Sequence, residues 1–250
     1  MRYFLFFIIM FTFDAHADTT TGLVGWWRMD EAAGTSAEDR SGKGNTGTLV
    51  GTPTWGAGKR GNAVSFNGAN YITVAQSPIS NFSNPSSICL WGLVTDNTGS
   101  SGGSNQTFLN FAVDANNEVR IVNNSVAGTG GAQPGGFAVG YKYAGNQVAV
   151  ATNSSGLIPN NTWTFLCYTY DGAATVTLYV NAATYSTTAA SVTQTTSNII
   201  GARATNASFL TGSVDDIRVY NRTLTAQDVY MLYLSDNKIR NAVMRNVQFK

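Results

Sequence analysis

Histidine is almost absent from this sequence, and glutamate is scarce. The single histidine, His16, lies in the apolar N-terminal region, so the remainder of the chain has no imidazole. This excludes Ser-His-Asp and Cys-His catalysis and any zinc or iron site with histidine ligands. The glutamates are Glu31, Glu38 and Glu118, whereas glycoside hydrolysis needs two carboxylates roughly 5 to 10 Å apart. We therefore expect a protein that is not an enzyme; an enzyme would need a Tyr/Arg/Asn mechanism.

Charge of either sign is also low. Charged residues make up 12% of the chain, and the formal net charge is +1. This balance creates no field that would attract nucleic acid or anionic lipid. We therefore expect no nucleic-acid partner.

The chain has one long apolar run, at residues 3–13. The run is about half of the roughly 20 residues that a membrane-spanning helix needs, and residues 15–17 have the small-x-small form that signal peptidase cuts. We predict a secretory signal peptide at residues 1–17, one domain at residues 18–234 and a C-terminal tail, solvated or added as an edge strand, at residues 235–250. The mature protein would then have no membrane span and would be extracellular or periplasmic.

The two cysteines, Cys89 and Cys167, each lie inside an apolar run typical of a strand. In an oxidising compartment they could form a disulfide. The alternative is two small buried hydrophobic side chains. The sequence does not give the distance between them, so both interpretations stay open.

Short β-branched or aromatic runs recur between turn signals, and Gly, Asn, Ser and Thr are abundant, which is typical of an all-β sandwich or barrel. Along residues 162–170, Phe165 and Cys167 share one face of a strand, and Leu166 and Tyr168 share the other. Because both faces are apolar, we predict a central strand there. The predicted strands are residues 23–29, 63–66, 71–74, 87–94, 107–113, 118–122, 137–141, 147–152, 162–170, 175–180, 197–201 and 212–220.

Turn and cap signals complete the prediction of the elements. Asp171 and Gly172 stand between two β-branched runs, which indicates a hairpin. One short helix is predicted at residues 226–234, with Thr225 as its N-cap and Asp228 near the positive end of its dipole.

Three separated segments carry recognisable motifs. Residues 22–68 contain an aromatic strand, an Asp-Glu turn, an Asp-x-Ser-Gly loop and a Gly-x-Ala-x-x-Phe-x-Gly strand. Residues 163–172 form a run that begins with Trp and ends in Tyr-Asp-Gly, and residues 212–225 contain the Asp-Asp-Ile-Arg-Val-Tyr strand before the predicted helix. In this order, the segments resemble the laminin-G-like jelly-roll family of the concanavalin-A-like lectin and glucanase fold.

The resemblance implies an antiparallel β-sandwich, a concanavalin-A-like jelly roll with one short C-terminal helix. Relatives that hydrolyse glycans commonly carry a Glu-x-Asp-x-(x)-Glu strand, and no such string occurs here. Residues 95–160 match no part of the family pattern. Any ligand-binding loop in that region therefore stays unassigned.

The last predicted strand contains a carboxylate on an apolar face. Asp215 alternates in phase with Ile217 and Val219, so we expect it to face the core with them. A buried carboxylate needs N–H donors or a cation, and the resemblance implies a structural Ca²⁺ at Asp215. Because Ca²⁺ takes six to eight oxygens, we expect further ligands from the first segment: Asp30, Glu31 and Asp39. The alternative is that the aspartates cap turns and accept backbone hydrogen bonds.

Glycan recognition typically stacks aromatic rings on sugar faces, but we assign the tryptophans to the core because each lies in a strand or beside a family motif. The five tryptophans are Trp26, Trp27, Trp55, Trp91 and Trp163. Candidate ligand-binding residues are then surface groups near the variable middle of the chain, and these are Asn110, Arg120, Tyr141 and Tyr143.

From these features we predict a secreted, non-catalytic module that binds carbohydrate, with glycans or glycoproteins as partners. The alternative is an adhesion or structural module that contacts protein at a cell or particle surface, for which exposed loops and low charge are equally suitable. A polysaccharide-active enzyme of the same fold is a third, less favoured interpretation.

Overall fold

The structure of the protein is a computed structural model, and it describes most of the chain from Thr19 to Ser235. The described residues are 19–81, 84–95, 106–114, 117–123, 126–127, 131–132, 136–143, 146–151, 156–173, 175–185, 188–190, 198–203 and 208–235. The predicted signal peptide and residues 236–250 lie outside them, so the predicted domain boundaries are not tested. No helix within the described ranges has the length and apolar character needed to span a membrane.

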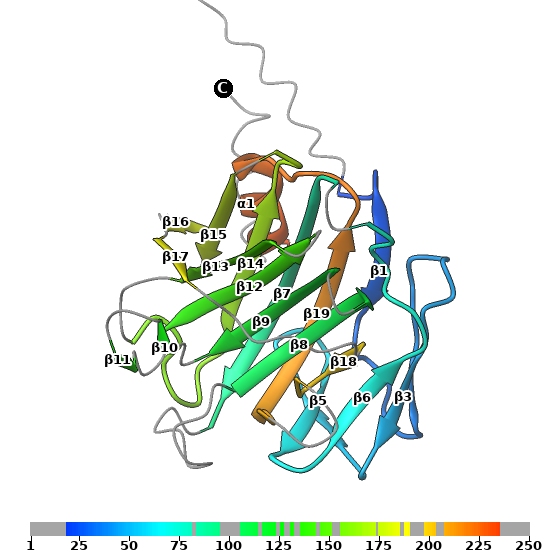
Figure 1. The fold of residues 1–250 in the computed structure, drawn as a ribbon. Coiled ribbons are helices and arrows are strands. Elements are labelled where there is room, and N and C mark those ends of the chain that lie inside the picture. Colours follow the sequence, from blue (N-terminus) through cyan, green and yellow to red (C-terminus); the bar gives the residue numbers. More distant parts are fainter. Residues whose placement is uncertain are drawn as a thin grey trace, which may run out of the picture.

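The strands form two large antiparallel sheets that face each other, together with one small hairpin (Figure 1). The order in the first sheet is β16 (Ala183–Tyr185), β15 (Val176–Val180), β14 (Thr164–Tyr170), β7 (Ser86–Val94), β19 (Thr211–Tyr220), β5 (Asn62–Asn67) and β4 (Thr54–Ala57), with β1 (Leu23–Trp27) also paired to β19. The order in the second sheet is β17 (Thr188–Ala190), β13 (Asn146–Ala151), β12 (Phe137–Tyr143), β9 (Asn117–Asn123), β8 (Gln106–Asp114), β18 (Ile199–Ile200), β6 (Tyr71–Val74), β3 (Gly47–Val50) and β2 (Ser36–Ala37). The hairpin pairs β10 (Val126–Ala127) with β11 (Gly131–Ala132).

This arrangement confirms the predicted β-sandwich. One apolar core lies between the sheets, and both contribute to it. Its members from the first sheet include Val64, Leu90, Leu166 and Val214, and those from the second include Ile72, Leu109, Ile121 and Val139. Each such side chain contributes about 1.5–3 kcal/mol through burial, so this core holds the two sheets together.

The strand predicted at residues 162–170 is central, as expected. It is β14, it lies between β7 and β15, and all seven of its residues are buried. Leu166 and Tyr168 face the inter-sheet core, whereas Phe165 and Cys167 belong to a second apolar cluster on the other face of the sheet. We call this second group the outer cluster, and its members are Cys89, Trp91, Phe165, Cys167, Tyr179, Tyr220, Leu224, Val229 and Leu232.

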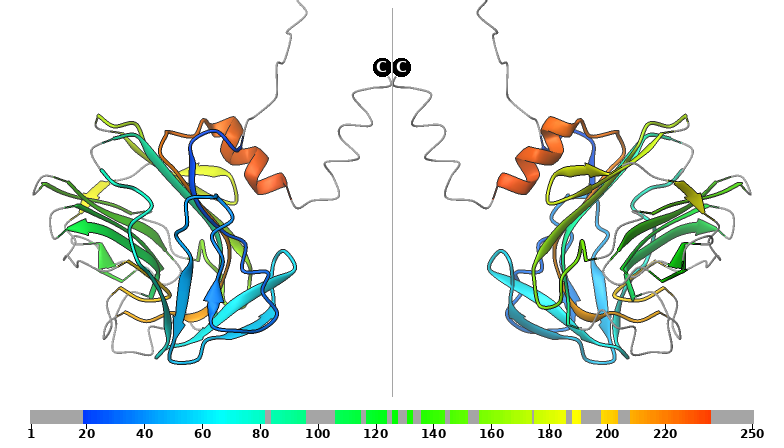
Figure 2. Two further views of the ribbon diagram at one scale, coloured as in Figure 1. Left: turned by 90° about the vertical axis from the view of Figure 1, so that its right-hand side faces the viewer. Right: turned by 90° about the vertical axis from the view of Figure 1, so that its left-hand side faces the viewer.

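Helix α1 (Ala226–Leu234) covers the outer cluster and explains why both faces of β14 are buried (Figure 2). The helix begins where predicted, because the Thr225 side chain accepts a hydrogen bond from the Asp228 N–H and the Asp228 side chain accepts one from the Thr225 N–H. This reciprocal capping satisfies two backbone donors at the helix start. Val229 and Leu232 then pack against the first sheet.

The strands that were not predicted are short. They include β2, β3, β4 and β16, which have two to four residues each. Their sequences are rich in Gly, Thr and Ala, so they carry too few alternating apolar residues to be recognised from periodicity. Pairing with longer neighbours forms them.

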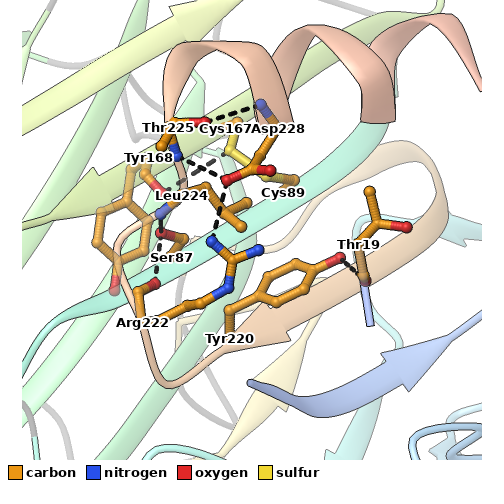
Figure 3. Close-up of a disulfide and its surroundings, with 10 residues drawn as sticks. All are labelled: Thr19, Ser87, Cys89, Cys167, Tyr168, Tyr220, Arg222, Leu224, Thr225 and Asp228. Atoms are coloured by element: carbon orange, nitrogen blue, oxygen red, sulfur yellow. Dashed lines mark hydrogen bonds and ion pairs between the residues drawn. A yellow bond between two sulfur atoms is a disulfide. The ribbon is translucent and has the colours of Figure 1, made fainter. Parts of the chain in front are cut away.

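The two cysteines are directly opposite each other on the neighbouring strands β7 and β14, and they form a disulfide with an S–S distance of 2.09 Å. Figure 3 places this bond beneath the start of α1, next to the segment from Tyr220 to Thr225 that leads into the helix. Both side chains are also buried, at 1% and 0% exposure. The pairing that the sequence left open is therefore present, inside the outer cluster.

We predict that replacing the pair, Cys89→Ala with Cys167→Ala, lowers the free energy of unfolding by about 2–4 kcal/mol, because the bond closes a long loop in the unfolded chain. The sequence separation is 78 residues. Urea unfolding of the oxidised and reduced protein and of the double variant measures the difference. The reduced protein is the matched control because it keeps both side chains. Equal midpoints for the oxidised and reduced forms would contradict the prediction.

Candidate functional site

A β-bulge in β19 positions the charged residues of this molecule. The register between β19 and β7 shifts between Asp215 and Arg218, and Asp216 has a positive φ of 45°. The bulge inserts one residue and thereby breaks the alternation of the strand. Val214, Ile217 and Val219 face the inter-sheet core, whereas Asp215 is paired with Trp91 of the outer cluster. The prediction that Asp215 shares a face with Ile217 and Val219 is therefore wrong.

Asp215 is nevertheless completely buried, at 0% exposure, on the outer face of the first sheet. One carboxylate oxygen, Oδ2, accepts the backbone N–H of Arg60 at 2.7 Å, and the other, Oδ1, is buried without a hydrogen-bond partner. The pKa of Asp215 is raised to about 7, chiefly by burial; the backbone N–H and charge of Arg60 lower it, and the neighbouring charges of Asp216 and Asp30 raise it. Asp215 therefore lacks the compensation that a buried carboxylate needs.

Asp30 lies on the other side of the same turn, residues 58–62, which connects β4 to β5. Its Oδ1 accepts the N–H of Asn62 at 3.3 Å, and its Oδ2 forms an ion pair with Arg28 at 2.7 Å. Two glycines make this close approach feasible, since a Cβ at Gly58 would lie 2.8 Å from Asp215 Oδ2 and a Cβ at Gly61 would overlap Asp30 Oδ1. Carboxylate and backbone carbonyl oxygens are the ligands that Ca²⁺ takes in proteins. Asp30 and Asp215, on either side of this turn, are therefore residues of a type that suits the implied cation.

Asp39 has a different role in the structure. Its oxygens accept the N–H groups of Trp26 at 3.0 Å, Ser41 at 2.9 Å and Asn45 at 2.8 Å. Burial alone would raise the pKa of Asp39, but these hydrogen bonds lower it below the ordinary value. Asp39 thus organises the loop after β1, as the turn-capping alternative predicts.

Glu31 accepts the N–H of Glu38 at 2.9 Å through Oε1. Among the residues that the structure describes, no three His, Cys, Asp or Glu side chains lie close enough together to hold a metal. The four predicted ligands therefore do not form one carboxylate cluster, and a cation at Asp215 would depend on Asp30 and backbone carbonyl groups.

Beside the turn at residues 58–62 lies a cavity of about 520 Å³ on the outer face of the first sheet. Most of its lining is charged or aromatic, and the lining residues are Trp26, Arg28, Asp30, Arg60, Gly61, Asp216, Arg218 and Ser235. We call it the arginine cavity.

Asp216 connects the walls of the arginine cavity. Its Oδ1 accepts the indole N–H of Trp26 at 2.7 Å and the Nε–H of Arg218 at 3.0 Å, and its Oδ2 accepts from Arg60 at 2.5 Å. Arg60 also donates to the Leu232 carbonyl at 2.9 Å and to the Ser235 hydroxyl at 2.5 Å, so it joins the cavity to the end of α1. Hydrogen bonds between charged groups are the strongest of the polar contacts in proteins, and this network fixes the side chains.

Trp26 forms the aromatic wall of the arginine cavity. It is half-buried, and the guanidinium carbons of Arg218 and Arg28 lie 4.8 Å and 5.7 Å from its ring centroid. Both distances are within the range of a cation–π interaction. Trp27, which points to the opposite face of β1, is fully buried in the core. The assignment to the core is confirmed for Trp27 and Trp91 and is wrong for Trp26.

The predicted ligand residues Asn110 and Arg120 are brought together, as cross-strand partners on β8 and β9. They are not surface groups, because Asn110 is 0% and Arg120 5% exposed, and that part of the prediction is wrong. In β12 the residue level with Arg120 is Gly140, while Tyr141 is paired with the core residue Val119. The side chains of Tyr141 and Tyr143 lie outside the described part of the structure.

The fold and its sequence identify the family. The family model for the concanavalin A-like lectin/glucanases superfamily matches residues 66–230, which is about two thirds of the chain. This protein belongs to that superfamily, as the sequence motifs indicated. A comparison with curated protein sequences found no significant match.

Several solved structures share the fold. One is domain 4 of AbnA, a GH43 extracellular arabinanase from Geobacillus stearothermophilus, in complex with arabinotriose, with a TM-score of 0.64, 21% identity, and coverage of 84% of this chain and 98% of that one. Another is the binding domain of Paraclostridial Mosquitocidal Protein 1, with a TM-score of 0.65, 16% identity, and coverage of 87% and 53%. The binding domain of botulinum neurotoxin DC in complex with rat synaptotagmin II has a TM-score of 0.62, 12% identity, and coverage of 88% and 53%. This chain spans about half of each toxin binding domain.

The raised pKa of Asp215 predicts an unusual pH dependence in the metal-free protein. An aspartate whose pKa is higher in the folded than in the unfolded state destabilises the fold as it ionises, so stability falls as the pH rises through about 7. We expect urea unfolding to show a loss on the order of 3 kcal/mol between pH 5 and pH 8 that Asp215→Asn removes.

The control is the exposed turn residue Asp171, whose variant Asp171→Asn should keep the wild-type pH dependence. The same pH slope for wild type and Asp215→Asn would contradict the assignment of this pKa.

Proposed function

We propose that this protein is a secreted, non-catalytic module that binds carbohydrate or glycoconjugates, and that the arginine cavity is its binding site. The observation that carries the proposal is the half-buried Trp26 ring in a cavity lined by guanidinium and carboxylate groups. Sugar sites combine an aromatic surface with a few fixed polar groups that orient hydroxyls. The hydrogen bonds at Asp216 would hold Trp26 and Arg218 in place before a ligand arrives, which limits the entropy lost on binding.

The same contacts argue against catalysis in this cavity. A carboxylate that acts as a general acid or base must exchange a proton with the substrate. Asp216 is occupied by two arginines and an indole N–H, and Asp30 is paired with Arg28. Neither carboxylate is placed to protonate a leaving group.

The structural relatives are consistent with a binding role. One is described in complex with arabinotriose, and others are toxin binding domains, one of them in complex with a protein, synaptotagmin II. These likenesses establish the fold only. They leave a protein-binding adhesion module as the alternative outcome of the test below.

We also propose that Asp215 and Asp30, with carbonyl groups of the turn at residues 58–62, hold a Ca²⁺ ion. The bound ion would supply the positive charge that Asp215 lacks. Arg60 donates its backbone N–H to Asp215 and its side chain to Asp216, so the turn links this position to the arginine cavity. A rigid turn would keep Arg60 and Asp216 in place.

The test of the binding function is a glycan array followed by calorimetry on the protein from residue 18 onward. We expect binding to a narrow class of glycans and a loss of at least tenfold in affinity for Trp26→Ala, because the ring that contacts the sugar is removed. Trp55→Ala is the matched control, since Trp55 is also half-buried but does not line the cavity. A blank array would favour the adhesion alternative.

The calcium proposal predicts that the protein melts at a higher temperature with Ca²⁺ than with chelator. The free energy of unfolding should increase by about 2.7 kcal/mol when the Ca²⁺ concentration is one hundred times the Kd. Asp215→Asn should abolish this response. Asp39→Asn should lower the starting stability and keep the response, because Asp39 is engaged by backbone N–H groups. Identical melting with calcium and with chelator would rule the site out.

A further inference from the structure

The arginine cavity carries an excess of positive groups. Three guanidinium groups, those of Arg28, Arg60 and Arg218, face two carboxylates, those of Asp30 and Asp216. Asp215 is buried beneath the turn at residues 58–62 and does not line the cavity. A concave site with one sign of charge in excess favours a ligand of the opposite sign.

The three arginines are not equivalent. Arg60 is committed to structural partners, because it donates to Asp216, the Leu232 carbonyl and Ser235. Arg218 donates through Nε to Asp216, and only 13% of its side chain is exposed. These two residues hold the walls of the cavity.

Arg28 is the arginine that faces outward. Its side chain is 53% exposed, and its contact with Asp30 uses a single nitrogen, Nη2, on one carboxylate oxygen. A guanidinium group has five N–H donors in a planar fork, so the other edge of Arg28 is available to a second carboxylate. Paired donation of this kind is the preferred way in which arginine binds carboxylate.

Trp26 lies directly beside this donor. Trp26 and Arg28 project from the same face of the chain, and the Arg28 guanidinium carbon is 5.7 Å from the Trp26 ring centroid. A sugar ring that packs against the exposed part of the indole would bring its substituents within reach of the Arg28 guanidinium.

We infer that the arginine cavity binds a uronic acid residue of an acidic saccharide, with the sugar ring on Trp26 and the carboxylate on Arg28. This inference rests on the proposed carbohydrate-binding function and narrows its ligand class. Another cavity, of about 310 Å³, has no charged side chain in its lining, which consists of Ala75, Gln76, Ser77, Ser80, Ala112 and Asn198. It offers no cation for a carboxylate and serves as an internal contrast.

The experiment measures binding to uronate oligosaccharides by calorimetry, each beside its carboxyl-reduced counterpart, in which the carboxylate is replaced by a neutral CH2OH group. The panel covers oligomers of glucuronate, galacturonate, mannuronate and iduronate. We expect at least one acidic oligomer to bind ten times or more tightly than its reduced counterpart. Raising the NaCl concentration from 0.05 to 0.5 M, conditions that we choose for the assay, should weaken binding several-fold because exposed charges are screened.

Variants of Arg28 test whether this side chain causes the preference for the acidic oligomer. Arg28→Gln should remove the preference for the acidic oligomer over its reduced counterpart, and Arg28→Lys should keep only part of that preference because lysine lacks the planar fork. The matched control is Arg40→Gln, since Arg40 is equally exposed, at 56%, and also forms a surface ion pair, with Glu38. It lies outside the cavity and should not alter binding.

The outcomes separate this inference from the proposed function. Equal binding of acidic and reduced oligomers, or an acidic preference that survives Arg28→Gln, overturns the inference and leaves carbohydrate binding intact. Binding of neutral glycans alone would likewise overturn the inference and leave the proposed carbohydrate binding intact. No binding to any saccharide overturns both.

Discussion

The Asp216 carboxylate is the contact on which the candidate site depends. It receives hydrogen bonds from Trp26 on β1, from Arg218 on β19 and from Arg60 in the turn between β4 and β5. Three segments that are far apart in the sequence thus meet at one side chain. Asp216 reaches these three partners because β19 departs from regular β geometry at this point, where the strand has a bulge and Asp216 has a positive φ. Because non-glycine residues adopt this backbone conformation at a cost, the surrounding ion pairs must stabilise it.

The outer face of the first sheet is divided between two environments. Helix α1 and the outer cluster bury one part of it, including the disulfide. The other part, next to the end of the helix, is left for the arginine cavity. Arg60 connects the two parts through its bonds to Leu232 and Ser235. A single short helix therefore completes the apolar packing of the sheet and also forms one edge of the candidate site.

The sequence was sufficient wherever the signal was local or strongly periodic. The capping residues Thr225 and Asp228 lie three positions apart, and the start of α1 followed from them. The two apolar faces of β14 likewise followed from strict alternation. The orientation of Asp215 could not be predicted, because the bulge arises from pairing with β7, which is more than 120 residues away. The burial of Asn110 and Arg120 depends on tertiary packing in the same way.

For Trp26 a signal did exist, since adjacent residues of a strand point to opposite faces and Trp27 is a core residue. Which of the two faces would be left partly open depends on where α1 lies.

The glycines of the turn at residues 58–62 restrict how this sequence can vary. A Cβ at Gly61 would overlap Asp30 Oδ1, whereas a Cβ at Gly58 would overlap the Asn62 carbonyl as well as approach Asp215. Gly61 and Asp30 therefore form a linked pair, while Gly58 is required by the turn backbone itself. In an alignment of related chains, a side chain in place of Gly61 should accompany a shorter residue in place of Asp30. Such paired changes would mark the branches of the family in which this turn no longer faces an aspartate on its Asp30 side.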